Sequence, residues 1–210
     1  SLDVVDRCLI ATDSNEVADV VNEYGAEVVM TSDEHRSGTD RIAEVARRPE
    51  YADYEVIVNV QGDEPFVPRS AITGAARLVI DQSFPIGTAA VVAGANVLRD
   101  PDTVKVVAAR DGRAMYFSRA PIPYLRESAD AALHESLIWQ HIGVYAYHWS
   151  VLQNWVSLPA SPLEQIERLE QLRPLAAGVP IGVSLIDEPA PLGIDTEDDL
   201  ARANRDWTAS

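Results

Sequence analysis

The feature that most constrains the fold is an alternation along the chain between short β-branched runs and amphipathic helical stretches. Strands are predicted at residues 7–12, 27–30, 55–60, 88–93 and 181–186, and helices at 14–24, 38–48, 68–82, 163–172 and from Thr196 onward. Strands joined by single helices imply right-handed βαβ crossovers. We therefore predict an α/β fold with a mostly parallel sheet covered on both faces.

The first helix has the clearest boundaries. Ser14 is a suitable N-cap for this helix, and Gly25 is a suitable residue to end it. Apolar residues recur at helical spacing between them, and we expect these to face inward. These residues are Val17, Val20, Val21 and Tyr24.

The middle of the chain has a different character. Residues 104–109 and 114–118 flank the turn Asp111-Gly112-Arg113 and predict a hairpin, and residues 138–148 predict another strand. We interpret residues from about 104 to 150 as an antiparallel excursion, where partner subunits often pair. Because no repeat or low-complexity linker divides the chain, we expect one domain over residues 1–210.

Charge and hydropathy restrict the partners. The 17 basic and 33 acidic side chains give a net charge of −16, which repels nucleic acid, although a metal ion and one or two basic residues could still bind a small nucleotide. No apolar run approaches the roughly 18–20 residues that a membrane-spanning helix needs. The first residues carry acidic side chains where a signal peptide would have basic ones. The chain has a single cysteine, Cys8, so it cannot form an internal disulfide, which fits a reducing compartment. We expect a cytoplasmic protein without nucleic-acid or membrane partners.

Two aspartates follow predicted strands. Ligands of open α/β sheets bind at the carboxyl ends of strands, and Asp63 lies there in the loop QGDEP at 61–65. Asp195 lies in a second strand-to-helix connection. The alternatives are an ordinary capped turn at Asp63 and helix N-terminal electrostatics at Asp195. Together the two carboxylates could hold one Mg²⁺ ion.

A third candidate is the segment 33–41, which leads into a helix N-terminus. Its backbone N–H groups and hydroxyls suit a polar ligand or a phosphate, and a simple capped helix is the alternative.

Blocks along nearly the whole chain resemble, in order, the bacterial CMP-Kdo synthetases, which activate the sugar acid 3-deoxy-manno-octulosonate (Kdo). The blocks are ATD (11–13), MT (30–31), HRSGTDR (35–41), VNVQGDEP (58–65), KVV (105–107), YFSRAPIP (116–123), HIGVY (141–145), SPLE (161–164), LEQLR (169–173) and GIDT (193–196).

The resemblance implies a three-layer Rossmann-like nucleotidyltransferase with a small antiparallel dimerisation arm. It implies a homodimer that converts CTP and Kdo to CMP-Kdo and pyrophosphate with Mg²⁺, for lipopolysaccharide biosynthesis. The implied catalytic and metal-binding residues are Asp63 and Asp195. The implied nucleotide contacts are Arg36, Ser37, Gly38, Thr39, Gln61 and Asp63, and the implied sugar-acid contacts are Gln61, Arg119, His141, Tyr145, Glu170 and Gln171.

The side-chain chemistry agrees with these roles. Arg119 can form a two-point contact to a carboxylate, and Glu170 and Gln171 can bond to sugar hydroxyls. Without the resemblance, His141 and Tyr145 would be read as strand residues with satisfied partners, and Glu170 as a solvated helix position.

One departure concerns the start of the chain. The family begins with a strand and a loop that holds the triphosphate, upstream of the strand at 7–12, and this sequence begins at Ser1 without them. We therefore expect the sequence to be part of a longer chain. A different acidic sugar as acceptor, or a catalytically silent binding protein, stays open as an alternative.

Overall fold

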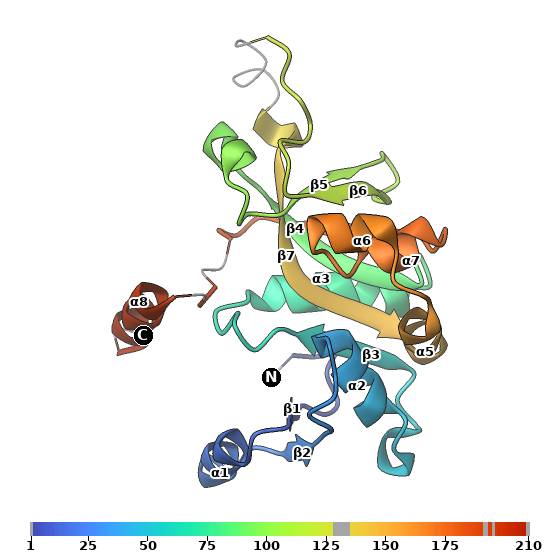
Figure 1. The fold of residues 1–210 in the computed structure, drawn as a ribbon, viewed down its shortest axis with the longest axis vertical. Helices are drawn as coiled ribbons and strands as arrows, with labels where there is room; N and C mark the ends of the chain where they lie inside the picture. Colours follow the sequence, from blue (N-terminus) through green and yellow to red (C-terminus); the bar gives the residue numbers. More distant parts are fainter. Residues whose placement is uncertain (1, 128–134, 191–192, 195, 209–210) are drawn as a thin grey trace.

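A computed structural model describes residues 2–127, 135–190, 193–194 and 196–208. Figure 1 shows a central sheet with helices on both sides. The strands are β1 (Ile10–Thr12), β2 (Val28–Met30), β3 (Val56–Val60), β4 (Ile86–Val92), β5 (Lys105–Ala108), β6 (Ala114–Ser118), β7 (Trp139–His148) and β8 (Ile181–Ile186). The helices are α1 (Asn15–Glu23), α2 (Gly38–Ala46), α3 (Arg69–Ile80), α5 (Trp149–Ser157), α6 (Pro162–Glu167), α7 (Leu172–Ala176) and α8 (Glu197–Thr208).

The main sheet is organised around β7. Its strand order is β6-β5-β7-β4-β8, and β3 also pairs with β7. Strand β7 runs antiparallel to β3, β4 and β5, so these three strands and β8 share one direction, as expected for a mostly parallel sheet. Pair by pair, however, the sheet is mostly antiparallel, because β7 is inserted beside β3, β4 and β5; among the described strands of this sheet, β4 and β8 form the parallel pair.

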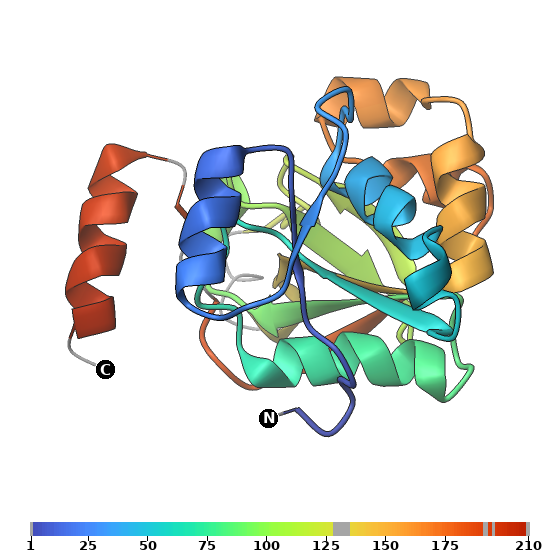
Figure 2. The same ribbon diagram turned by 90° about the horizontal axis from the view of Figure 1, so that it is seen from below.

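Side chains alternate across β7 and separate two cores. Tyr145 and Tyr147 face a cluster that includes Trp155 of α5, whereas Val144 and Ala146 face a second cluster against α3. This alternation follows from the two-residue period of a strand. Figure 2 shows the resulting layers, with α3 on one side of the sheet and α2, α5, α6 and α7 on the other. The predicted α/β class with both faces covered is confirmed.

The hairpin predicted near Gly112 is present as β5 and β6. The turn closes with a hydrogen bond from the Ala109 N–H to the Arg113 carbonyl at 2.8 Å, and Gly112 has φ +83°. The last strand of the predicted excursion is β7, which lies inside the main sheet. None of the described helices combines the length and the apolar character that crossing a membrane requires.

The predicted packing of α1 is wrong, although its cap is correct. The Ser14 side chain accepts a hydrogen bond from the Val17 N–H, and Gly25 follows the helix with φ +69°. However, Val20 is 54% and Tyr24 86% exposed. Helix α1 packs mainly against β1 and β2, and a sheet of two three-residue strands is too small to cover the apolar face.

The single helix predicted at 163–172 is also wrong, because the chain breaks it into α6 and α7. Arg168 adopts a left-handed conformation with φ +56°, which ends α6. The break leaves Ile166 78% exposed on α6 and buries Leu169 and Leu172. It places Glu170 and Gln171 between the two helices, where Gln171 is buried and Glu170 bonds to Thr39 of α2.

Candidate active site

The site lies where the main sheet opens along one edge of β7. On that edge β3 pairs as far as Val144, and β5 begins to pair at Gln140. In between, the Gly143 N–H donates a hydrogen bond to a carboxylate oxygen of Glu64, at 3.2 Å, instead of joining a strand ladder. The loop after β3 therefore meets β7 at Gly143, whereas the His141 N–H still bonds to the Val104 carbonyl beside β5, at 2.9 Å.

Two glycines allow this loop to approach its neighbours. A Cβ atom on Gly143 would lie 2.6 Å from Oε1 of Glu64, which is closer than real contacts allow. A Cβ atom on Gly38 would lie 3.2 Å from Oε1 of Gln61. Gln61 therefore packs against the N-terminus of α2 and lies next to β7, between the segments predicted to contact the two substrates.

The start of α2 is joined directly to the segment between α6 and α7. Ser37 caps the helix by accepting a hydrogen bond from the Asp40 N–H at 3.1 Å. Thr39, which is only 4% exposed, donates a hydrogen bond from its hydroxyl to Glu170 at 2.9 Å. Burial raises the pKa of the Glu170 carboxyl. The contact links the predicted nucleotide segment with the predicted sugar-acid segment.

Aromatic side chains hold His141 and Tyr145 beside this junction. The His141 ring meets the edge of Phe117 at 5.1 Å and lies 5.4 Å from the Tyr145 ring. Burial lowers the pKa of His141 to about 3 and raises the pKa of Tyr145 well above its usual value, so both rings are neutral at neutral pH. Gln171 is also buried.

Arg119 lies at the end of β6 and is already partly engaged. Its Nε donates to the Glu167 carbonyl at 3.1 Å, and its Nη1 donates to the Pro101 carbonyl at 2.9 Å. Its backbone N–H donates to the Glu167 carboxylate at 3.0 Å. Nη2 makes no hydrogen bond within the described ranges, so it is the guanidinium nitrogen that can still donate to a ligand.

The structure describes one of the two predicted metal ligands. Asp63 is exposed after β3, and its carbonyl accepts a hydrogen bond from the Ile194 N–H at 2.8 Å. Asp195 lies outside the described residues. Within the described chain, no group of three or more His, Cys, Asp or Glu side chains could hold a metal. An exposed carboxylate such as Asp63 still fits Mg²⁺, which takes one or two protein carboxylates together with substrate phosphates.

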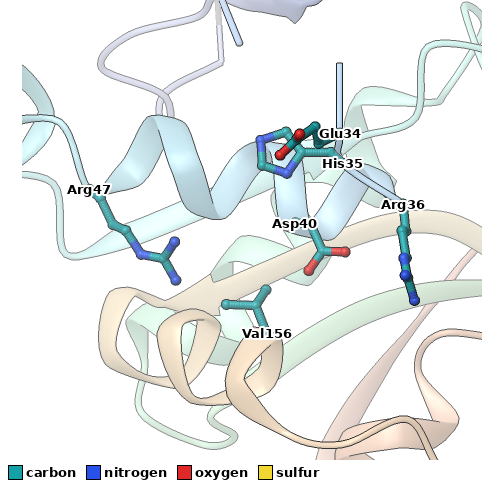
Figure 3. Close-up of a pocket in the computed structure, with 6 residues that line it drawn as sticks. All are labelled: Glu34, His35, Arg36, Asp40, Arg47 and Val156. Atoms are coloured by element: carbon teal, nitrogen blue, oxygen red, sulfur yellow. The ribbon is translucent and has the colours of Figure 1, made fainter. Parts of the chain in front are cut away.

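Arg36 lines a pocket of about 300 Å³ beside α2. Figure 3 shows Asp40 between Arg36 and Arg47, with Val156 of α5 across the pocket. The pocket combines two guanidinium groups with the carboxylates of Glu34 and Asp40, so its lining is polar and carries charges of both signs.

Sequence reasoning did not assign several residues that organise this site. Thr88 bonds to His141, Glu167 bonds to Ser118 and Arg119, and the buried Lys105 donates to the carbonyls of Asp100, Thr103 and Arg119 at 2.7, 2.6 and 2.5 Å. A polar residue within an apolar strand was the available signal for Thr88 and Lys105.

Known proteins similar to this chain share its fold and much of its sequence. The family model described as cytidylyltransferase matches residues 1–181. A 3-deoxy-manno-octulosonate cytidylyltransferase from Gemmatimonas aurantiaca is 56% identical over 206 residues, which cover 98% of this chain and 80% of that protein. The protein of the same name from Stenotrophomonas maltophilia is 45% identical over 92% of this chain and 78% of its own length.

Two solved structures are similar to the computed one. A structure of CMP:2-keto-3-deoxy-manno-octonic acid synthetase complexed with CTP matches with a TM-score of 0.86 and 36% identity, over 98% of this chain and 82% of that chain. An inositol-1-phosphate CTP transferase from T. maritima matches with a TM-score of 0.61 at 16% identity, over 97% and 75% of the two chains, which indicates a shared fold.

Proposed function

This chain belongs to the cytidylyltransferase family, and from that premise we propose that it is a 3-deoxy-manno-octulosonate cytidylyltransferase, which converts CTP and Kdo to CMP-Kdo and pyrophosphate. The observation that carries the proposal is the 56% identity over 98% of the chain to a protein of that name. The hydrogen bond between Thr39 and Glu170 supports it, because it brings together the segments that we assign to the two substrates.

The reaction is an in-line transfer at phosphorus. The anomeric hydroxyl of Kdo attacks the α-phosphorus of CTP, the bond to the pyrophosphate oxygen breaks, and the hydroxyl proton passes to solvent or to a nearby base. Catalysis of this kind depends mainly on positioning and electrostatics. Bound Mg²⁺, held by Asp63 and Asp195, would offset the charge that develops on the phosphate oxygens.

The remaining residues position the substrates. We assign Arg36 and the capped start of α2, from Ser37 to Thr39, to the nucleotide. We assign Gln61 to both substrates because it lies between α2 and β7. The sugar acid contacts are then Arg119 through its carboxylate, and His141, Tyr145, Glu170 and Gln171 through its hydroxyls.

The test is pyrophosphate release from CTP with Kdo, with ATP and GTP in place of CTP and with sialic acid or an amino variant of Kdo in place of Kdo. We expect strong preference for CTP, since a site that hydrogen-bonds a base edge rejects bases that leave its polar groups unpaired. Equal turnover with CTP and ATP, or faster turnover with another sugar acid, would contradict the assignment.

We also propose a cytoplasmic homodimer that supplies lipopolysaccharide biosynthesis. Exposed apolar side chains near the β5–β6 hairpin support a subunit contact: Met115 is 64%, Tyr124 81% and Leu137 56% exposed. Light scattering of the purified protein at micromolar concentration measures the mass directly. A monomer that persists at the highest soluble concentration would contradict the homodimer.

A further inference from the structure

Thr88 is a hydroxyl residue in the middle of β4, the most buried strand of the sheet. Its neighbours Gly87 and Ala89 are fully or almost fully buried, and Thr88 itself is 0% exposed. A buried hydroxyl needs hydrogen-bond partners. The Oγ1 atom lies 2.7 Å from the Val144 carbonyl oxygen, 3.4 Å from the Ile142 carbonyl oxygen and 2.9 Å from Nε2 of His141.

A β-bulge explains why the carbonyls need Thr88. Thr88 pairs with Tyr145, but Ala89 pairs with Ile142, so β7 carries two extra residues, Gly143 and Val144, opposite β4. A bulge interrupts the hydrogen-bond ladder and leaves backbone groups without their usual partners. The Thr88 hydroxyl satisfies the Val144 carbonyl at this interruption.

Proton accounting then determines the state of His141. A threonine hydroxyl has one proton to donate, and a carbonyl oxygen can only accept. The 2.7 Å separation from the Val144 carbonyl places the Thr88 proton in that bond. His141 must therefore donate to Thr88. We infer that Thr88 is a positioning residue that holds the His141 ring in the tautomer protonated on Nε2, which leaves Nδ1 as a hydrogen-bond acceptor.

The surroundings of the ring support this assignment. Burial lowers the pKa of His141 to about 3, so the ring carries one proton at neutral pH and the tautomer is defined. Phe117 and Tyr145 fix the ring plane. Nδ1 makes no hydrogen bond to any residue in the part of the chain that the structure describes, and His141 as a whole residue is half-buried. Nδ1 is thus the nitrogen left for a ligand.

The tautomer makes the site selective for a donor. A lone pair on Nδ1 accepts a hydrogen bond from a hydroxyl and repels a carboxylate. This step rests on the proposed function, because it identifies the ligand group beside His141 as a hydroxyl of the sugar acid. The carboxylate of the substrate then lies away from His141, toward Arg119.

The direct test is ¹⁵N NMR of the histidine rings in the whole chain. The protein has four histidines, and His141→Gln identifies the His141 signals by their loss. We expect the wild-type ring to be protonated on Nε2, Thr88→Ser to keep that tautomer, and Thr88→Val to lose it. The exposed His148, on the same strand, serves as the internal reference. Protonation of wild-type His141 on Nδ1, or an unchanged tautomer in Thr88→Val, would overturn the inference.

Kinetics give a second, independent readout. Thr88→Val should raise KM for Kdo roughly 10-fold and leave KM for CTP unchanged, since a lost hydrogen bond near the sugar acid is worth about that factor. Thr88→Ser should restore the wild-type value. An equal rise in both KM values would show a merely structural role and overturn the proposal.

If Thr88→Val does not fold, the wild-type and Thr88→Ser spectra still decide. If the wild type turns over no Kdo, the proposed function fails while the spectra still test the tautomer.

Discussion

Asp63 is the residue with the most direct chemical role in the proposed reaction. We predict that Asp63→Asn abolishes turnover while leaving the fold intact, because a neutral amide is a much poorer ligand for Mg²⁺ and the loss of one carboxylate should cost several kcal/mol of transition-state stabilisation. Since the side chain is exposed, its replacement should not affect packing. Pyrophosphate release measures whether turnover is lost, and thermal melting measures whether the fold stays intact.

The matched control for this prediction is Asp53→Asn, which removes an exposed carboxylate away from the sheet edge. It should leave turnover unchanged. Turnover by Asp63→Asn within a few-fold of the wild type would refute the metal assignment.

Arg119 tests the sugar-acid side of the site. We predict that Arg119→Lys raises KM for Kdo by at least 10-fold and KM for CTP much less, because lysine cannot reproduce the planar arrangement of donors. Arginine can bond to the carbonyls of Glu167 and Pro101 while it keeps Nη2 for a carboxylate, and a single ammonium group cannot do both. Substrate titrations measure both constants. If neither changes, Arg119 has only a structural role.

The sequence predicts best the residues whose chemistry is visible without contacts. Asp63 is predicted as a ligand because it follows the strongest strand, where α/β sheets bind ligands, whereas the role of Gln61 is implied only by the family resemblance. Thr88 and Lys105 were missed as parts of the site. Their importance comes from partners far along the chain, since Thr88 bonds to His141 and Lys105 bonds to the carbonyl of Arg119. Such partners depend on strand pairing, which residue patterns do not specify.

At the scale of elements, one side chain joins α6 to α7. The Glu164 carboxylate accepts hydrogen bonds from the Ser161 N–H at 3.1 Å and from Arg173, whose Nε is 2.9 Å away. Burial alone would raise the pKa of Glu164, but the Arg173 guanidinium lowers it overall. The Arg173 side chain is 15% exposed and the Glu164 side chain 11% exposed, so this ion pair is largely shielded from water.

We predict that Glu164→Ala lowers the free energy of unfolding by about 3 kcal/mol, because it leaves the Arg173 charge shielded and unpaired. Ser161→Ala, which removes only the reciprocal cap, should cost about 1 kcal/mol. Urea unfolding measures both. A loss in Glu164→Ala no larger than that in Ser161→Ala would show that the ion pair contributes little.

Helix α2 holds the loop that precedes it through Glu44. This carboxylate accepts hydrogen bonds from the Ser32 N–H at 3.0 Å, from His35 at 2.5 Å and from Arg48 at 2.9 Å, and these lower the pKa of Glu44 from 4.5 to about 2. Because the pKa is lower in the folded state, the carboxylate stabilises the fold above pH 4.5. This contribution disappears as the pH falls from about 4.5 to about 2.

We predict that Glu44→Gln reduces this acid dependence. Between pH 4.5 and pH 2, the free energy of unfolding of the wild type should fall by about 1–2 kcal/mol more than that of the variant. This estimate is kept small because the Glu44 side chain is 29% exposed and water screens its interactions. Chemical unfolding at several pH values measures the difference. Glu23→Gln, at an exposed position on α1, should behave like the wild type, and parallel curves for all three proteins would contradict the prediction.

Element types were easier to predict than their partners. The residue pattern identified residues 138–148 as a strand but could not show that β7 would pair with β3, β4 and β5. The apolar spacing of α1 was correct as a helical pattern and wrong about burial. The break at Arg168 could not be seen because only a backbone conformation, not a glycine or proline, marks it.

At the scale of the whole molecule, the net charge of −16 acts on the folded state as self-repulsion. Salt shortens the Debye length from about 30 Å at 0.01 M to about 8 Å at 0.15 M. We predict that the melting temperature at pH 7 rises by several degrees over this range. Near pH 4.5, where the charges of the sequence balance, the rise should vanish, and an equal rise at both pH values would contradict the explanation.

The position of β7 also determines when the sheet can form as a ribosome synthesises the chain. Among the described strands, β3 pairs only with β7, and β4 pairs only with β7 and β8. Until residues 139–148 leave the exit tunnel, β1–β2 and β5–β6 are the described pairs that can close. The apolar strands β3 and β4 therefore spend much of translation with open edges, the state in which nascent chains aggregate and chaperones bind them.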